Sequence, residues 1–415
     1  MLRPLEGKSV PAQPRRDRML INAAGCLRSL GVGLVGVVLG IYLYRVGFSS
    51  VSIGLVVAAG LAGTALATLL VSLFADRFGR RQALILLAIL SAGGGIALAF
   101  VPVLPLLLVT AFLTMLNGTG SDRSASYALE QGILPGLAPD ARRTWNLAWY
   151  NVLLDGGGSL GALGASLPIL LQRHLQVSMV AAYKSLFIGY AGLWLVVAVL
   201  ATLLSPAVEV VRASQSEGWR HTVAPHTRIV LPKLTALFSL DAFGGGFLTD
   251  ALVAYWFFRR FNIPEQDLGL LFFGVHVLNA LSHLGAAWLA RRIGLVNTMV
   301  FTHLPSSLFL MAVPFAPSFR WAVALFLCRE ALVEMDVPTR QSYVAAMVRP
   351  EERTLASGVT NLARNVFWGV GSAAAGLLMQ VFSFSAPLLI GGGTKVVYDV
   401  LLYGSFRGLK APEER

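Results

Sequence analysis

Apolar residues are gathered into twelve long runs, each bounded by charged residues, proline or glycine. A helix needs about 20 apolar residues to cross the hydrocarbon core of a bilayer, and each run reaches about that length. The pattern therefore predicts twelve transmembrane spans, near residues 19–44, 51–75, 82–101, 104–134, 144–172, 180–204, 233–259, 266–290, 296–315, 318–347, 354–382 and 386–404.

A polar segment divides these spans into six and six. We predict five regions: a basic tail at 1–18, a six-helix bundle at 19–204, a linker at 205–232, a second six-helix bundle at 233–404 and a tail at 405–415. Of the 33 Lys and Arg, 21 lie on the side of the tails and the linker, and six lie on the opposite side. Because basic residues gather on the cytoplasmic side of membrane proteins, we expect both termini in the cytoplasm.

The composition agrees with a membrane protein and excludes other classes. Hydrophobic residues make up 56% of the chain and charged residues 13%, about half the charged share of a soluble domain. The net charge of +12 comes from basic residues at the ends of spans, so nucleic acid is not an expected partner. Cys26 and Cys328 lie inside spans without metal-ligand spacing, so we expect neither a disulfide framework nor a metal site.

The two halves of the chain resemble each other. Residues 75–79 (Ala-Asp-Arg-Phe-Gly) correspond to residues 290–294 (Ala-Arg-Arg-Ile-Gly) at an offset of 215, and Asn151 corresponds to Asn361 at an offset of 210. Each half has an even number of spans, so both halves have one orientation in the membrane. We therefore expect them to be related by an axis along the membrane normal.

Residues 72–81 (Ser-Leu-Phe-Ala-Asp-Arg-Phe-Gly-Arg-Arg) lie between spans two and three. They are similar to the signature G-x-L-A-D-R-x-G-R-R of the major facilitator superfamily, and the six-plus-six layout extends the resemblance over nearly the whole chain. The resemblance implies an all-α membrane protein with twelve transmembrane helices in two six-helix bundles related by pseudo-two-fold symmetry. It also implies a central cavity lined by spans one, four, seven and ten. Gly157-x3-Gly161 on span five is similar to the glycine-rich motif of the superfamily's antiporters, which favours export.

Fifteen charged residues lie inside the spans, and spans one, four, seven and ten hold eleven of them. Charge inside a membrane is costly and indicates function by default. Six of these residues lie roughly 13–20 Å from the cytoplasmic ends of their spans, near the middle of the bilayer. We predict a cavity for substrate and protons that is formed by Arg28, Asp122, Arg123, Asp155, Asp241, Asp250, Glu330, Glu334, Asp336 and Arg364.

Particular pairs are expected within this layer. The offset of 215 places Arg28 opposite Phe243, two residues from Asp241, and predicts an Arg28–Asp241 ion pair. Asp241 or Asp122 is expected to carry the coupling proton, because each has a candidate arginine partner in Arg28 or Arg123. Glu334, Glu330 and Asp155 are the next candidates.

Two further spacings carry predictions. Asp241 and Asp250 point to opposite sides of an ideal helix, so both can face the cavity only if the Gly244–Gly246 run bends or unwinds the helix. Lys395 and Asp399 are spaced as a structural i, i+4 ion pair.

The resemblance implies a cytoplasmic gate at Asp76, Arg77, Gly79, Arg80 and Arg81. Asp76 would cap the start of span eleven near Thr354 in the opposite half, where free N–H groups and the helix dipole stabilise a carboxylate. Glu130 and Arg340 are equivalent at an offset of 210 near the inner ends of spans four and ten, and we expect them to form a second latch.

Other interpretations remain open. The charges inside the spans could form static ion pairs, and His276, His283 and His303 are more simply packed or hydrogen-bonded histidines than proton sensors or metal ligands. Residues 157–161 satisfy the G-x-S-x-G pattern of serine hydrolases, with Ser159 as nucleophile and His276 or His283 as base. That motif needs a strand-to-helix turn, so we expect no enzyme and no catalytic residue.

No phosphate-binding G-x-x-x-x-G-K-[ST] motif is present, so we expect a proton gradient as energy source and no cofactor. The sequence favours a proton-coupled antiporter that exports a small organic or amphiphilic molecule. The alternative is a symporter that imports an organic acid, with Arg28 or Arg364 holding the carboxylate. We expect a monomer in the lipid bilayer of a bacterial or archaeal cell membrane.

Overall fold

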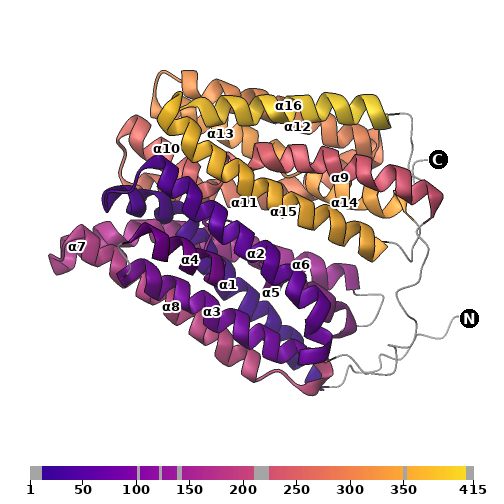
Figure 1. The fold of residues 1–415 in the computed structure, drawn as a ribbon, viewed down its shortest axis with the longest axis horizontal. Coiled ribbons are helices and arrows are strands. Elements are labelled where there is room, and N and C mark those ends of the chain that lie inside the picture. The colour runs from indigo at the N-terminus through magenta and orange to yellow at the C-terminus, as the bar shows by residue number, and fades with distance from the viewer. Residues whose placement is uncertain are drawn as a thin grey trace, which may run out of the picture.

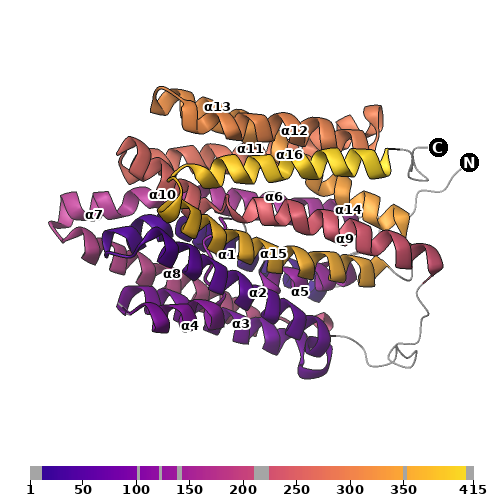
Figure 2. The same cartoon turned by 45° about the horizontal axis from the view of Figure 1, so that its top comes forward.

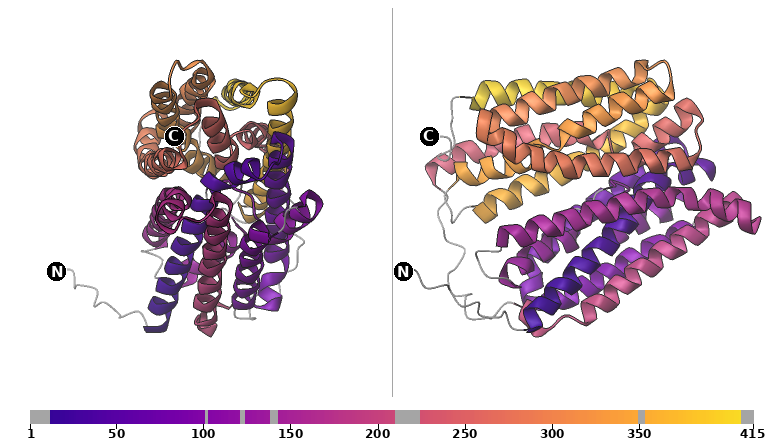
Figure 3. Two further views of the ribbon diagram at one scale, coloured as in Figure 1. Left: turned by 90° about the vertical axis from the view of Figure 1, so that its left-hand side faces the viewer. Right: turned by 180° about the vertical axis from the view of Figure 1, so that it is seen from behind.

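The computed structural model describes residues 12–100, 103–120, 124–137, 143–209, 224–348 and 353–407. Within these ranges the chain forms helices and no strands. Figure 1 shows one bundle, coloured indigo to magenta, packed against a second bundle, coloured rose to yellow, and the end-on view in Figure 3 separates the two. The predicted all-α fold of twelve transmembrane helices in two six-helix bundles is confirmed.

Several of the twelve spans consist of two helices in sequence. The N-terminal half comprises α1 (Ala12–Arg45), α2 (Ser50–Phe78), α3 (Arg80–Phe100), α4 (Leu104–Thr114) with α5 (Ala125–Ile133), α6 (Arg143–Leu163) with α7 (Leu167–Leu175), and α8 (Met179–Thr202). The C-terminal half comprises α9 (Pro225–Gly246) with α10 (Asp250–Phe261), α11 (Glu265–Ile293), α12 (Leu295–Ala312), α13 (Phe319–Val333) with α14 (Asp336–Met347), α15 (Arg353–Val381), and α16 (Ala386–Phe406).

The breaks in spans seven and ten have local causes. Pro338 lies in the first turn of α14, where it has no N–H to donate and its ring would clash with the carbonyl of residue 334, so α13 ends at Val333. Span seven breaks at residues 247–249, directly after the Gly244–Gly246 run. Each break places polar residues at a helix end in the middle of the bundle.

Eight helical segments in the described part of the chain are each long and apolar enough to cross a membrane. Spans four, ten, eleven and twelve are not among them. Span four is interrupted, and spans ten to twelve contain charged residues that the fold turns towards other helices.

Both described chain ends lie at one end of the molecule, at the right of Figure 1, and we call this the terminal end. We call the opposite end the far end. There α1 and α10 end and α8 begins. Gly79 and Gly294, equivalent at the offset of 215, end α2 and α11 at the terminal end with φ of 110° and 89°. Residues other than glycine rarely adopt such angles, so the same backbone turn occurs in both copies.

Among the described residues, the two halves contact each other mainly through three pairs of helices: α2 with α15, α6 with α11, and α1 with α10. Gly54 of α2 and Gly376 of α15 lie against each other near the far end, where a methyl group on Gly54 would lie 3.0 Å from the Cα atom of Gly376. The ribbons of the two halves diverge towards the terminal end, as the view from behind shows (Figure 3). The turned view in Figure 2 shows α9 and α15 side by side within the C-terminal half.

Polar contacts also join the halves at the far end. The Arg45 guanidinium donates to the Glu265 carboxylate at 2.5 Å, and the Tyr183 hydroxyl donates to the same oxygen at 2.9 Å. Nearer the middle of the bundle, at the break in span seven, the N–H group of Ala251 donates to the carbonyl of Gly118 at 3.1 Å. At the terminal end, by contrast, Ser205 binds Asp17 and Arg16 binds the carbonyl of Leu203, all within the N-terminal half and the segment after it.

Candidate functional site

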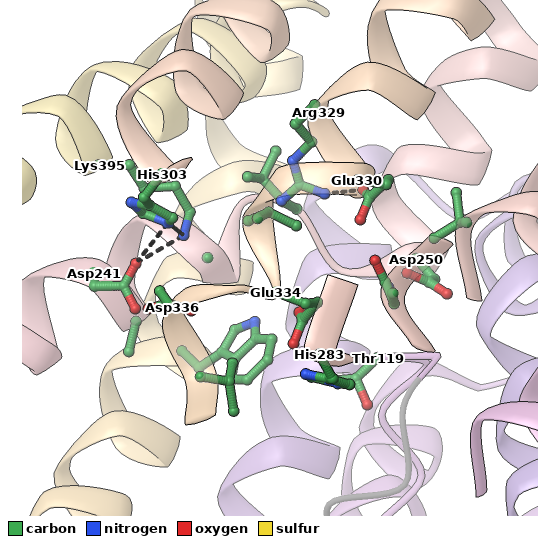
Figure 4. Close-up of a pocket in the computed structure, with 18 of the residues that line it drawn as sticks. Thr119, Asp241, Asp250, His283, His303, Arg329, Glu330, Glu334, Asp336 and Lys395 are labelled. Carbon is green, nitrogen blue, oxygen red and sulfur yellow. Dashed lines mark hydrogen bonds and ion pairs between the residues drawn. The ribbon is translucent and has the colours of Figure 1, made fainter. Parts of the chain in front are cut away.

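A cavity of about 120 Å³ lies between the two halves, at the level of the helix breaks (Figure 4). Thr119 and Asp155 line it from the N-terminal half, and the other lining residues belong to the C-terminal half. The ionisable lining residues are Asp155, Asp241, Asp250, His276, His283, His303, Arg329, Glu330, Glu334, Asp336, Arg340, Arg364 and Lys395. Seven of the ten predicted cavity residues are therefore brought together.

Asp241 and Asp250 both line this cavity. The helix ends at Gly246 and restarts at Asp250, which is the interruption that the glycine run was expected to allow. Asp122 and Arg123, two further predicted cavity residues, lie outside the described residues.

Asp241 forms the centre of a charged cluster in the C-terminal half. Its Oδ1 atom accepts from Lys395 Nζ at 2.8 Å, and its Oδ2 atom accepts from Arg364 Nη1 at 2.9 Å and from Arg340 Nη1 at 3.3 Å. His303 Nε2 lies 3.6 Å from Oδ1. The three cations come from α14, α15 and α16, so a single buried carboxylate holds three helices around α9.

Two more acids complete what we call the Asp241 cluster. Arg340 also donates to Asp336 at 2.6 Å, and His303 Nδ1 lies 2.9 Å from an oxygen of Asp399. Lys395 binds Asp241 and not Asp399, which lies four residues further along its own helix and contacts His303 instead. The expected i, i+4 pair of Lys395 and Asp399 is wrong. The charges inside the cluster nearly balance, as buried charges must if they are to stay in a low-dielectric interior.

The opposite wall of the cavity carries a second group of ionisable residues. Arg329 is hydrogen-bonded to its neighbour Glu330, and Glu334, His283 and Thr119 lie together below them in Figure 4. Glu334 is the C-cap residue of α13, at the break caused by Pro338, and this break turns its side chain towards the cavity. The cavity is thus lined by charge on both sides.

The expected Arg28–Asp241 pair is wrong. Arg28 lies inside the N-terminal half, 1% exposed, and its guanidinium donates to both oxygens of Glu130 at 2.5 and 2.8 Å. The Tyr150 hydroxyl donates to Glu130 at 2.5 Å, and Arg28 also lies 3.2 Å from that hydroxyl. Close packing of α1 on α6, through Gly25 against Tyr150, turns Arg28 away from the opposite half.

The second predicted latch is not formed in this conformation, in which the halves diverge at the terminal end, and it stays a prediction. Glu130 binds Arg28 and Tyr150, whereas Arg340 binds Asp336 and Asp241, so each residue is held within its own half. Positions that are equivalent in two repeats are related by the symmetry axis and need not touch.

The basic loop between α2 and α3 contacts a residue that the sequence did not single out. The N–H groups of Arg80 and Arg81 donate to the Glu209 carboxylate at 2.7 and 3.1 Å, which satisfies free donors at the start of α3. Arg81 also donates to the carbonyl of Thr202. The sequence offered one signal for this contact: Glu209 is an acidic residue that follows span six directly, in a segment rich in arginine.

The other gate predictions are not tested. The Asp76 side chain lies outside the described residues, as do residues 210–223 of the linker and most of both tails. Arg77 is exposed at the end of α2. Ser159 lies inside α6 and its hydroxyl donates to the carbonyl of Asp155 at 2.9 Å, so it does not sit on the turn that a hydrolase nucleophile needs.

Comparisons with known proteins agree with this architecture. The family model of the Major Facilitator Superfamily matches residues 21–328 and 234–415. The chain is 26% identical over 426 residues to the uncharacterized membrane protein YJR124C of Saccharomyces cerevisiae, and the match covers 95% of each chain.

Solved structures are similar in fold. A mutant of the nucleoside transporter NupG has a TM-score of 0.75 at 14% identity, covering 94% of this chain and all of its own. A D-xylose-proton symporter has a TM-score of 0.75 at 16% identity, covering 97% and 99%. An inward-facing, unoccupied bacterial homolog of the human lysosomal transporter Spinster has a TM-score of 0.72 at 13% identity, covering 96% of each chain.

Proposed function

The chain belongs to the Major Facilitator Superfamily, and from this premise we propose that it is a proton-coupled secondary transporter of a small, polar organic solute. The observation that carries this proposal is the charged cavity between the two halves. A site at the interface of two repeats becomes accessible from each side in turn when one repeat rocks against the other.

The lining of the cavity supports a hydrophilic cargo. Charged and hydrogen-bonding groups surround it on both sides, so an amphiphilic molecule would leave many of them unsatisfied. The D-xylose-proton symporter and the nucleoside transporter with the same fold carry polar solutes, as their names say. The broader expectation of an amphiphilic substrate therefore has less support.

The direction of transport is proposed to be export, and import is the alternative. A separate observation supports each. The Gly157-x3-Gly161 spacing on α6 supports export by antiport with protons. The alternative, import by symport, is supported by Arg364, which lines the cavity and could hold a substrate carboxylate. Arg28 is not suited to this role, because it is buried against Glu130 within the N-terminal half.

The proposed topology places both termini in the cytoplasm, on the basis of the Lys and Arg distribution. The far end then faces outside, and the contacts of Arg45, Glu265 and Ala251 close that side. The relative from yeast means that a eukaryotic membrane is as compatible with the sequence as a bacterial or archaeal one. Labelling of single cysteines in the 205–232 linker from each side of the membrane tests this topology.

A ligand screen followed by a flux assay tests the proposed function. Purified protein is screened by thermal shift against sugars, nucleosides, amino acids and organic acids. Each stabilising solute is then assayed in proteoliposomes with an imposed pH gradient, with and without a protonophore. We expect uptake or release that follows the gradient and stops with the protonophore. A flux that does not change with the pH gradient would reject proton coupling. If none of the stabilising solutes is transported, the proposal that the protein is a transporter is rejected.

A further inference from the structure

Asp250 and His276 form a pair that the Asp241 cluster does not include. Asp250 is the first residue of α10, directly after the break in span seven, and His276 lies in the middle of α11. Asp250 Oδ2 and His276 Nε2 are 3.5 Å apart, and their side chains are 16% and 7% exposed. Neither atom has a hydrogen-bond partner in the described part of the chain.

The N-terminal half covers this pair with glycines. A methyl group on Gly120 would overlap the Asp250 carboxylate, and one on Gly36 of α1 would lie 3.3 Å from the Cβ atom of Asp250. Gly158 of α6 lies over the His276 ring, where a methyl group would be 3.8 Å away. The pair therefore belongs to the C-terminal half but lies at the seam between the halves, next to the hydrogen bond from Ala251 to Gly118.

The cavity walls around the pair carry other charged groups. Arg329 and Glu334 face it from span ten, Asp155 lines the same cavity from α6, and His283 lies two turns further along α11. Asp241 differs from Asp250 because three cations already bind it within 3.3 Å and hold it as an anion. Asp250 has no such partner at hydrogen-bond distance among the described residues.

One proton satisfies both members of the pair. Without an added proton the pair of carboxylate and neutral imidazole carries a buried net charge of −1. One added proton, held between the Asp250 oxygen and the His276 nitrogen, brings the net charge to zero and makes a hydrogen bond that satisfies both atoms. The 3.5 Å separation needs only a small rotation to reach that bond. We propose that Asp250 and His276 together bind the coupling proton, an inference that rests on the proposed function.

The position of the pair explains how access to it would change. In this state the glycines of the N-terminal half separate it from the far end. If the halves part at the far end, α1 and residues 118–120 leave α10, the Ala251–Gly118 hydrogen bond breaks, and the pair becomes open to that side. The proton would then be bound or released on one side in each state, as coupled transport requires.

A pH titration followed by infrared spectroscopy tests proton binding without any substrate. The wild-type protein in lipid should show a carboxylic acid C=O band that appears on acidification, and Asp250→Asn should lose this band. His276→Gln keeps the acid and should shift the midpoint of its titration. Asp267→Asn, near the start of the same α11 helix but outside the cavity, serves as the matched control and should keep the band assigned to Asp250 and its midpoint.

Two results would overturn the inference: an unchanged set of titrating bands in Asp250→Asn, or an unchanged midpoint in His276→Gln. If Asp250→Asn does not fold, the His276→Gln result still decides. Flux assays separate this inference from the proposed function. Asp250→Asn should lose accumulation driven by the pH gradient while retaining measurable exchange of labelled solute. If the wild type and Asp250→Asn both accumulate solute along the pH gradient, the Asp250–His276 proton site is rejected and the proposed function stands. If the wild type shows no such accumulation, the proposed function is rejected.

Discussion

Arg28 and Asp241 show how single buried charges are stabilised in the two halves. Each is nearly inaccessible, and each is bound by groups of opposite charge from other helices of its own half. Taking one partner away from a buried pair leaves an uncompensated charge, which is more costly than removing the whole pair. Two predictions follow from this asymmetry.

Glu130→Gln should lower the free energy of unfolding by about 3–5 kcal/mol, because it leaves the Arg28 guanidinium buried without a counter-charge. Thermal unfolding of the purified protein in detergent measures the loss. The double variant Arg28→Met with Glu130→Leu removes both charges and should recover most of the stability. A double variant as unstable as Glu130→Gln would show that packing, not charge, is responsible.

Asp241→Asn should destabilise the C-terminal half more than Lys395→Met does. The first change leaves three cations without their shared anion, whereas the second leaves Asp241 with Arg340 and Arg364. The order of the two unfolding temperatures, measured under identical conditions, checks this. The reverse order would mean that the cluster does not depend on Asp241 as its centre.

The sequence was informative about which residues carry charge and less informative about which residues they bind. Seven of the ten predicted cavity residues line the cavity, because charge within an apolar span must face other helices. The Arg28–Asp241 pair failed because a repeat offset relates positions by symmetry and says nothing about contact. His276 was set aside as an ordinary packed residue, since its partner Asp250 is brought to it only by the helix break.

The predicted spans agree with the helices to within a few residues, except that α1 starts at Ala12 and α9 at Pro225, several residues before the predicted starts at 19 and 233. The second span was placed at 51–75 and α2 runs from Ser50 to Phe78. The break in span seven was foreseen from three consecutive glycines, but the break in span ten was not. A single Pro338 inside an apolar run can kink a helix or end it, and tertiary packing decides between the two.

The close contact between Gly54 of α2 and Gly376 of α15 at the far end allows a further prediction. Gly54→Ala places a methyl group against Gly376 and the carbonyl of Ser372, so it should shift the equilibrium towards states with the far end open. Spin labels at positions 46 and 382, on opposite halves, should report longer distances. Gly189→Ala on α8 has open space around it and should leave the distances unchanged. Unchanged distances in Gly54→Ala would show that this contact does not limit closure.

The two-bundle architecture was predictable from the sequence, whereas the conformation of the transporter was not. The repeat and the motif at residues 72–81 identify the fold, because they reflect features common to every state. Which end is closed depends on small differences between contacts such as Arg45–Glu265 and Ala251–Gly118. The repeat and the motif are the same in every conformational state, so they do not indicate which state the structure shows.

Glu265→Gln should weaken closure of the far end by about 2 kcal/mol or more, since it removes the ion pair with Arg45 between the halves. The change corresponds to a shift of about 30-fold in the ratio of states. A cysteine introduced at Thr119 in the cavity should then react faster with an impermeant maleimide added on the far side. Asp267→Asn is the control, and an equal rate in both variants would contradict the assignment.

The Asp241 cluster also constrains how the chain is made. The partners of Asp241 follow it by 99, 123 and 154 residues, so the last of them is synthesised only with the final span. Until then a lone aspartate in span seven costs about 2.5–3.5 kcal/mol at the centre of a membrane helix. Spans ten to twelve are not among the described helices that are long and apolar enough to cross a membrane by themselves. The C-terminal half should therefore leave the translocon as a group, and chains that stop before span twelve should be held by membrane chaperones or degraded.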